Sequence, residues 1–209
     1  DFEAALGQVT GASHGVACSS GTAALNLAAM ALNLGPGDKV VVPALTFLTT
    51  ANVVRMTGAE VVFADVDPVT GLMGGKELSA ALSQKGSGQV KAVFSVHYAG
   101  QCAAPDELAA VARGLPVVAD SCHALGTAYG SDGKVGDCRH AVMETFSFHP
   151  VKTIAAGEGG AVTTNDGVLA QRLRRLRNHG MTRDADAFVR NDLARDGDGD
   201  TNPWYYEMA

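Results

Sequence analysis

The feature that most constrains the fold of this chain is a regular alternation of short apolar runs with longer segments of helical composition. The apolar runs read as strands at residues 39–42, 60–64, 90–96, 115–119, 141–147 and 160–164. The segments between them read as helices at residues 22–34, 47–57, 75–83, 105–113 and 166–177. Strands that alternate with helices form a mostly parallel sheet with helices on both faces. The pattern therefore predicts a three-layer α/β/α fold.

Composition is consistent with one domain over residues 1–209. With 46% hydrophobic and 18% charged residues, a chain of 209 residues can bury a substantial core. A net charge of −6 without a basic block argues against nucleic acid as a partner. No apolar run is long enough to cross a bilayer, so no membrane association is expected. Residues 85–88 (KGSG) are predicted to form a surface loop.

The four cysteines are predicted to be reduced and small buried side chains. Cys18, Cys102, Cys122 and Cys138 form no C-x-x-C pair, and no signal peptide is expected. This pattern favours a cytoplasmic location and offers no metal site. Three aspartates at 196, 198 and 200, together with Glu207, have the spacing of a calcium loop. Thr201 stands where that loop requires glycine, so a flexible loop is the favoured interpretation.

A group of chemically versatile side chains follows two of the predicted strands. Asp120 and His123 come after the run at 115–119, while Ser147 and Lys152 end or follow the run at 141–147. Open α/β sheets bind ligands at the carboxyl ends of their strands. A lysine amine can hold an aldehyde as a Schiff base, a carboxylate can keep a pyridine nitrogen protonated, and a hydroxyl can bind phosphate. Together they suggest pyridoxal phosphate, although Lys152 by itself could equally be a surface lysine.

A candidate anion site stands at the start of the first predicted helix. Residues 19–22 (SSGT) directly precede the helical stretch AALNLAAM. Free N–H groups and the helix dipole make such a turn attractive to a phosphate. A plain N-cap is the more common role of this pattern when it is considered alone. Its occurrence with Asp120 and Lys152 in one chain favours the cofactor site. The arginines at 172, 174, 175 and 177 are interpreted as a solvated helix end rather than a second phosphate site.

Several motifs resemble, in content and order, those of the DegT/StrS family of pyridoxal-phosphate-dependent nucleotide-sugar aminotransferases of fold type I. They are SSGTAAL (19–25), PALTF (43–47), DVD (65–67), HYAGQ (97–101), DSCHALG (120–126), SFHPVK (147–152) and GEGG (157–160). The resemblance covers essentially the whole chain. Residues 148–153, 178–180 and 204–208 look most like the branch that makes UDP-4-amino-4,6-dideoxy-N-acetyl-β-L-altrosamine on the route to pseudaminic acid.

The resemblance implies a role for each site residue. Lys152 would hold the cofactor as a Schiff base and shuttle a proton once released, and Asp120 would bind the pyridinium nitrogen. His123 would lie near the phenolic oxygen of the cofactor, and Phe47 would stack on its ring. Three residues are implied as ligands of the phosphate: Gly21, Thr22 and Ser147.

The same resemblance implies an activity and a context for it. The amino group would pass, with glutamate as the expected donor, to C4 of a UDP-4-keto-6-deoxy-N-acetylhexosamine in a homodimer with shared active sites. Family members run to nearly twice this length, so the chain is expected to be most of the large domain without the small C-terminal domain. Two alternatives stay open: a sugar dehydratase of the same family, in which histidine replaces the Schiff-base lysine, and a cofactor-binding fragment without catalysis. Lys152 argues against the dehydratase.

Overall fold

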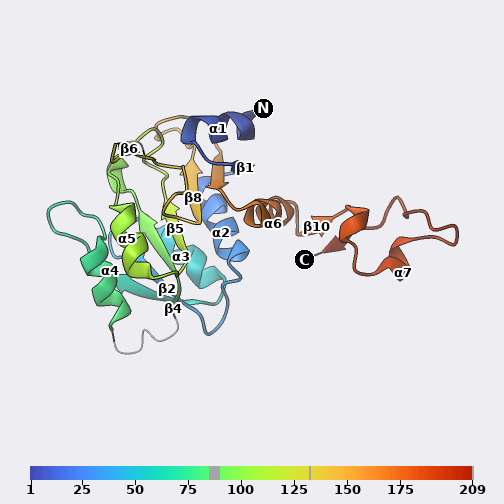
Figure 1. Cartoon of the computed structure of the whole chain (residues 1–209), viewed down its shortest axis with the longest axis horizontal. Coiled ribbons are helices and arrows are strands. Elements are labelled where there is room, and N and C mark those ends of the chain that lie inside the picture. The colour runs from blue at the N-terminus through green and yellow to red at the C-terminus, as the bar shows by residue number, and fades with distance from the viewer. Residues whose placement is uncertain (85–89, 132, 209) are drawn as a thin grey trace.

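The centre of the molecule is a seven-stranded sheet with the strand order β1-β9-β8-β5-β4-β2-β3, seen in a computed structural model that describes residues 1–84, 90–131 and 133–208 (Figure 1). Its strands are β1 (His14–Cys18), β2 (Lys39–Pro43), β3 (Glu60–Ala64), β4 (Val90–Val96), β5 (Val117–Asp120), β8 (Met143–Ser147) and β9 (Gly160–Thr164). β9 runs antiparallel to β1 and β8, whereas the remaining pairs are parallel. The predicted mostly parallel sheet is confirmed. The loop predicted at 85–88 lies outside the described residues.

Helices cover both faces of the sheet. They are α2 (Gly21–Ala31), α3 (Leu48–Met56) and α6 (Gly167–Arg177) on one face, and α4 (Gly75–Leu82) and α5 (Pro105–Ala112) on the other. Strand β2 shows why both layers form: Val40 and Val42 pack with α2 and α3, while Val41 packs with α4 and α5. Because every residue of this short apolar run meets a helix, the run carries no polar alternation.

Two elements at the N-terminus were not predicted from the sequence patterns. Helix α1 (Phe2–Thr10) is short and contains a glycine, and β1 has an unremarkable composition. Tertiary contacts hold both of them in place. Leu6 of α1 joins a third apolar cluster with Phe146 and Phe148, and β1 pairs along its whole length with β9.

The outer edge of β1 is covered by side chains from two helices. Glu3 of α1 accepts a hydrogen bond from the Ala17 N–H at 2.9 Å. Arg177 of α6 donates to the Ala17 carbonyl at 2.8 Å, and Arg174 donates to the Gly15 carbonyl at 3.3 Å. Unpaired edge groups invite pairing with another chain, so these contacts protect the edge. These two arginines are therefore edge contacts and not merely a solvated helix end.

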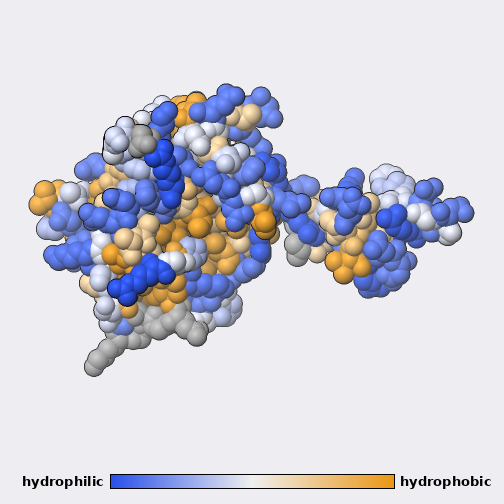
Figure 2. Space-filling view, viewed as in Figure 1, coloured by the Kyte–Doolittle hydropathy of each residue, from blue (hydrophilic) through white to orange (hydrophobic). Residues whose placement is uncertain are grey.

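The segment after α6 extends away from the sheet (Figure 1). It holds a short pair of strands, β10 (Met181–Thr182) and β11 (Glu207–Met208), with η2 (Ala185–Ala187) and α7 (Asn191–Ala194) between them. Apolar side chains reach its surface (Figure 2), and Trp204 is 82% exposed. Asp196 caps its own turn by accepting from the Asp198 and Asp200 amides. Within the described ranges, no three His, Cys, Asp or Glu side chains are placed to hold a metal ion.

The remaining elements are small and lie near the carboxyl ends of β4 and β5. They are η1 (Tyr98–Gly100), β6 (Ala128–Tyr129) and β7 (Gly133–Lys134). Of the four cysteines, Cys138 is buried and the other three are half-buried, so only one matches the expected full burial. In the part of the chain that the structure describes, no helix is long and apolar enough to span a membrane.

Gly160 allows the start of β9 to touch the first turn of α2, and this contact yields a prediction. A Cβ at this position would overlap the Ser20 carbonyl and come within 2.8 Å of the Gly21 nitrogen. Both neighbours are backbone, which cannot rotate away. We expect Gly160→Ala to lower the free energy of unfolding by about 1–3 kcal/mol, the usual cost of overpacking. Urea unfolding measures the loss.

Gly35→Ala is the matched control for this substitution. A Cβ at Gly35 meets no atom within 4 Å, so this variant should unfold at nearly the wild-type urea concentration. Equal stability of the two variants would contradict the close approach of β9 and α2.

Candidate functional site

A cavity of about 500 Å³ opens at the carboxyl ends of β4, β5 and β8, beside the first turn of α2. All of the site residues predicted from the sequence line it: Gly21, Thr22, Phe47, Asp120, His123, Ser147 and Lys152. The chain positions of these residues are far apart, and the parallel sheet brings them to one edge. Their placement together is what the structure shows, while their individual roles stay predictions.

Asp120 is the most firmly held of these side chains. It ends β5, is only 6% exposed, and accepts hydrogen bonds from the Thr50 hydroxyl at 2.9 Å and from the Cys122 amide at 3.2 Å. Thr50 is itself fully buried and pairs with the Thr46 hydroxyl at 2.8 Å. A buried carboxylate needs such donors, because an unpaired charge in the interior is expensive. The two bonds fix its orientation at the floor of the cavity.

The first turn of α2 forms the opposite end of the site. Ser20 is the N-cap, with extended backbone and a hydroxyl that accepts from the Ala23 amide at 3.1 Å. The first N–H groups of the helix, on Gly21 and Thr22, have no acceptor within the helix. Ser147 lies against them, since a Cβ on Gly21 would be only 2.8 Å from the Ser147 Cβ. Two N–H groups, a hydroxyl and the helix dipole thus converge, as an anion site requires.

Lys152 lies in the loop that follows β8 and not in the strand itself. Its backbone closes a turn by donating to the His149 carbonyl at 2.9 Å. The side chain is half-buried, lines the cavity and has no hydrogen-bond or ion-pair partner among the described residues. In the same loop the His149 Nε2 lies 3.9 Å from a carboxylate oxygen of Glu158. The Lys152 amine is therefore free to react with a ligand in the cavity.

His123 and Phe47 occupy the walls. The His123 Nδ1 accepts from the Ala99 amide at 3.3 Å, so the neutral ring carries its proton on Nε2. Partial burial, and then the nearby Lys152 charge, lower the pKa of His123, while Asp120 opposes the shift. Phe47 precedes α3 and is 63% exposed at the cavity, which leaves its ring face open to a planar ligand.

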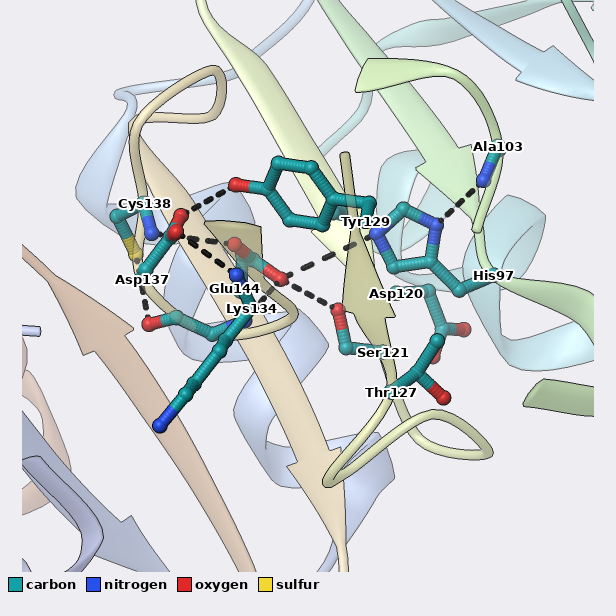
Figure 3. Close-up of polar contacts among 12 residues, drawn as sticks. His97, Ala103, Asp120, Ser121, Thr127, Tyr129, Lys134, Asp137, Cys138 and Glu144 are labelled. Atoms are coloured by element: carbon teal, nitrogen blue, oxygen red, sulfur yellow. Dashed lines mark hydrogen bonds and ion pairs between the residues drawn. The ribbon is translucent and has the colours of Figure 1, made fainter. Parts of the chain in front are cut away.

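A network of buried polar side chains lies under the cavity (Figure 3) and was not predicted from the sequence. Its centre is Glu144 of β8, 4% exposed, which accepts from the Ser121 hydroxyl and the Gly136 amide, each at 2.8 Å. Burial raises the pKa of Glu144 to about 7. The His97 imidazole faces it at 4.0 Å and accepts from the Ala103 amide at 3.0 Å. The available signal was a glutamate in the middle of an apolar run, which is unusual in a buried strand.

Comparisons with known proteins agree with this geometry. Residues 1–196 match the model of the DegT/DnrJ/EryC1/StrS aminotransferase family. The chain is similar to the GDP-perosamine synthase of Caulobacter vibrioides, with 41% identity over 185 residues that make up 87% of this chain and 47% of that protein.

Two solved structures show the same likeness in three dimensions. The fold resembles that of DesV from S. venezuelae, with 34% identity and a TM-score of 0.79 over 88% of this chain and 48% of the other. It also resembles NtdA from Bacillus subtilis with bound cofactor PMP. The sequence identity is 28%, and the TM-score is 0.77 over 86% of this chain and 39% of the other. The chain thus spans about half the length of the relatives it matches, or less.

The buried His97 yields a prediction for the dependence of stability on pH. Burial lowers the pKa of its imidazole from 6.5 to about 4. Between these values the unfolded chain binds a proton that the folded protein does not, so stability falls as the pH falls. As the pH falls, the free energy of unfolding should therefore decrease more steeply in the wild type than in His97→Asn. The two slopes should differ by up to about 1.4 kcal/mol per pH unit.

Asparagine is the suitable replacement because its amide oxygen can still accept from the Ala103 N–H. The contribution of Glu144 is common to both proteins and largely cancels in the difference. Urea unfolding at pH values from 4 to 6.5 measures the two slopes. Parallel profiles would show that His97 is not buried as a neutral ring.

Proposed function

The chain belongs to the DegT/DnrJ/EryC1/StrS aminotransferase family, and from this premise we propose that its protein is a pyridoxal-phosphate-dependent nucleotide-sugar aminotransferase. The observation that carries the proposal is the convergence of Lys152, Asp120 and the first turn of α2 in one cavity of about 500 Å³. The cofactor requires three groups: an amine that can react with its aldehyde, a carboxylate for its pyridine nitrogen and an anion site for its phosphate.

The residues present fit the cofactor at each of its polar groups. The Asp120 carboxylate suits a protonated pyridine nitrogen, because the Thr50 hydroxyl and the Cys122 amide orient it at the cavity. The N–H groups of Gly21 and Thr22 and the Ser147 hydroxyl suit a phosphate. NtdA, one of the similar structures, binds the amine form of the same cofactor. When bound, the cofactor supplies an aldehyde and an electron-accepting ring.

The side chains of this chain then have distinct tasks. Lys152 would hold the cofactor through its amine and would also act as the general acid and base that moves a proton during amino transfer. Asp120 would hold the protonated pyridine nitrogen, where its charge favours the electron-accepting form of the ring. His123 would bind near the phenolic oxygen through its Nε2–H, and Phe47 would cover the ring face and exclude water from it.

For the acceptor we propose a nucleotide-linked 4-keto-6-deoxyhexose. The motifs at 148–153, 178–180 and 204–208 favour the UDP-linked N-acetylhexosamine that leads to pseudaminic acid, with glutamate as donor. The similarity to a GDP-perosamine synthase favours a GDP-linked sugar instead. The UDP-sugar is the first candidate because one of the motifs that favour it, residues 148–153, lies in the loop that carries Lys152 at the cavity. Both candidates use the same residues at the cofactor.

We also propose that the protein is a cytoplasmic homodimer with shared active sites. Two exposed apolar side chains line the cavity, Phe47 at 63% and Val151 at 78%, and two more lie beside them in the sequence, Leu48 at 61% and Ile154 at 53%. Such a cluster on a surface marks a contact with another surface. Two-fold pairing is the commonest way to supply one. The free cysteines fit a reducing compartment.

The test is turnover by the native protein with glutamate and each keto sugar in turn. We expect 2-oxoglutarate and a 4-amino sugar to form in equal amounts with the UDP-sugar. Lys152→Arg should lose about 10³-fold or more in turnover, because arginine keeps the charge but cannot form the covalent link. Lys134→Arg, a change at an exposed lysine of β7, is the matched control and should retain activity.

Other outcomes separate the alternatives. Amino transfer only to the GDP-sugar would move the assignment to a perosamine-type enzyme. Loss of a sugar hydroxyl without amino transfer would indicate a dehydratase. Cofactor binding without turnover of either sugar would leave only a non-catalytic binding protein. Sedimentation velocity of the same preparation tests the dimer, and an active monomer would contradict it.

A further inference from the structure

Glu144 is a buried carboxylate that the proposed function does not use. It lies in the middle of β8, beside β5, where its parallel partner in the ladder is Ala119, one residue before Asp120. The side chain is 4% exposed and does not line the cavity. Burying an acid is unfavourable unless its hydrogen bonds compensate, and a hydrophobic residue at this place would often be no less stable. Stability alone therefore does not explain an acid at this position.

Glu144 gathers donors from three separate segments. The Ser121 hydroxyl, after β5, donates at 2.8 Å. The amides of Gly136 and Cys138, in the loop after β7, donate at 2.8 and 3.2 Å. His97, at the end of β4, presents Nε2 at 4.0 Å, and this nitrogen carries the proton because Nδ1 accepts from the Ala103 amide. All four neighbours can donate, and the hydrogen bonds from Gly136 and Cys138 reach both oxygens of the carboxyl group.

Two of these segments flank Asp120. Ser121 is the next residue in the chain, and its own amide donates to the Thr145 carbonyl at 2.9 Å. His97 donates through its backbone amide to the Asp120 carbonyl at 3.0 Å. Figure 3 shows Ser121 between Glu144 and Asp120, with the His97 ring facing Glu144. The other titratable groups of the network, Asp137 and Tyr129, bind each other on the far side of the loop.

We propose that Glu144 is a positioning residue of the active site: by binding Ser121 and the loop amides together, it fixes the turn that carries Asp120 and Cys122. The inference rests on the proposed function, since it assigns a role toward the same cofactor site. Glu144 touches neither cofactor nor substrate. Its effect passes through Ser121 to the carboxylate that meets the pyridine nitrogen, where a small displacement strongly weakens an oriented interaction.

The alternative is that Glu144 only anchors the loop at 133–138 to the sheet through hydrogen bonds. Asp137 offers a matched control, because it holds the same loop through the amides of Lys134 and Arg139 but does not contact Ser121. Asp137→Asn should loosen the loop and leave the Asp120 turn intact. Ser121→Ala does the reverse, since it removes the link to the turn and leaves the loop amides bound to Glu144.

The experiment measures pyridoxal 5′-phosphate binding to the native apoprotein of four variants, Glu144→Gln, Glu144→Asp, Ser121→Ala and Asp137→Asn. We expect Glu144→Gln and Ser121→Ala each to raise the dissociation constant about tenfold, as the loss of a buried hydrogen bond to a charged group does. The pyridine nitrogen of the bound cofactor, followed by its absorbance as the pH is raised, should also lose its proton at lower pH. Asp137→Asn should lower the urea midpoint while leaving both readouts within about twofold of wild type.

The four variants test the role of Glu144 independently of the proposed enzymatic activity. Binding and titration do not require turnover, so a protein that transfers no amino group still reports on Glu144. If Glu144→Gln does not fold, Ser121→Ala decides the question alone. Partial rescue by Glu144→Asp supports the positioning role. Wild-type binding and titration in Ser121→Ala, or equal effects of Glu144→Gln and Asp137→Asn on the two readouts, would overturn it.

Discussion

The buried carboxylate of Asp120 is the interaction on which the arrangement of the site depends. A charge that is only 6% exposed must be matched by donors, and Thr50 and the Cys122 amide provide them from α3 and from the turn after β5. Meeting that requirement ties α3 to the centre of the sheet. Thr49, the neighbour of Thr50, pairs through its hydroxyl with Thr22 at 3.3 Å, so the same helix also fixes the first turn of α2. One buried charge thereby links both ends of the cavity.

Charge is distributed unevenly around this point. Below the cavity lie acidic and neutral groups, with Glu144 and Asp137 bound by amides and hydroxyls and His97 held neutral by burial, which lowers its pKa. The cavity itself is lined by the Lys152 amine and the positive end of α2, together with the carboxyl groups of Asp120 and Glu158. An anionic, planar ligand with one protonated nitrogen fits this division. The acidic floor favours the protonated nitrogen, while the helix end favours the phosphate.

Much of the fold could be predicted because its central strands are short apolar runs that helices cover on both faces. The run at 39–42 meets helices through successive valines, so its composition alone reveals it. α1 and β1 could not be found this way, because long-range contacts with β9 and α6 hold them. The sequence could bring Asp120, Ser147 and Lys152 to one edge of the sheet because strand ends carry recognisable polar residues, whereas Phe47 came from the family resemblance alone, and the roles of all of them stay predictions. Glu144 was not, because its partners come from segments that only the folded chain brings together.

The central claim is that Lys152 is the amine that binds the cofactor, and reductive trapping tests it most directly. Borohydride reduction of the native protein loaded with pyridoxal 5′-phosphate fixes the link as a stable secondary amine, and peptide mapping then locates it. The account predicts the label on Lys152, because its amine faces the cavity without a partner among the described residues. A label on another lysine, such as Lys91, which is bound to Asp38, would contradict the account. So would cofactor binding without any label.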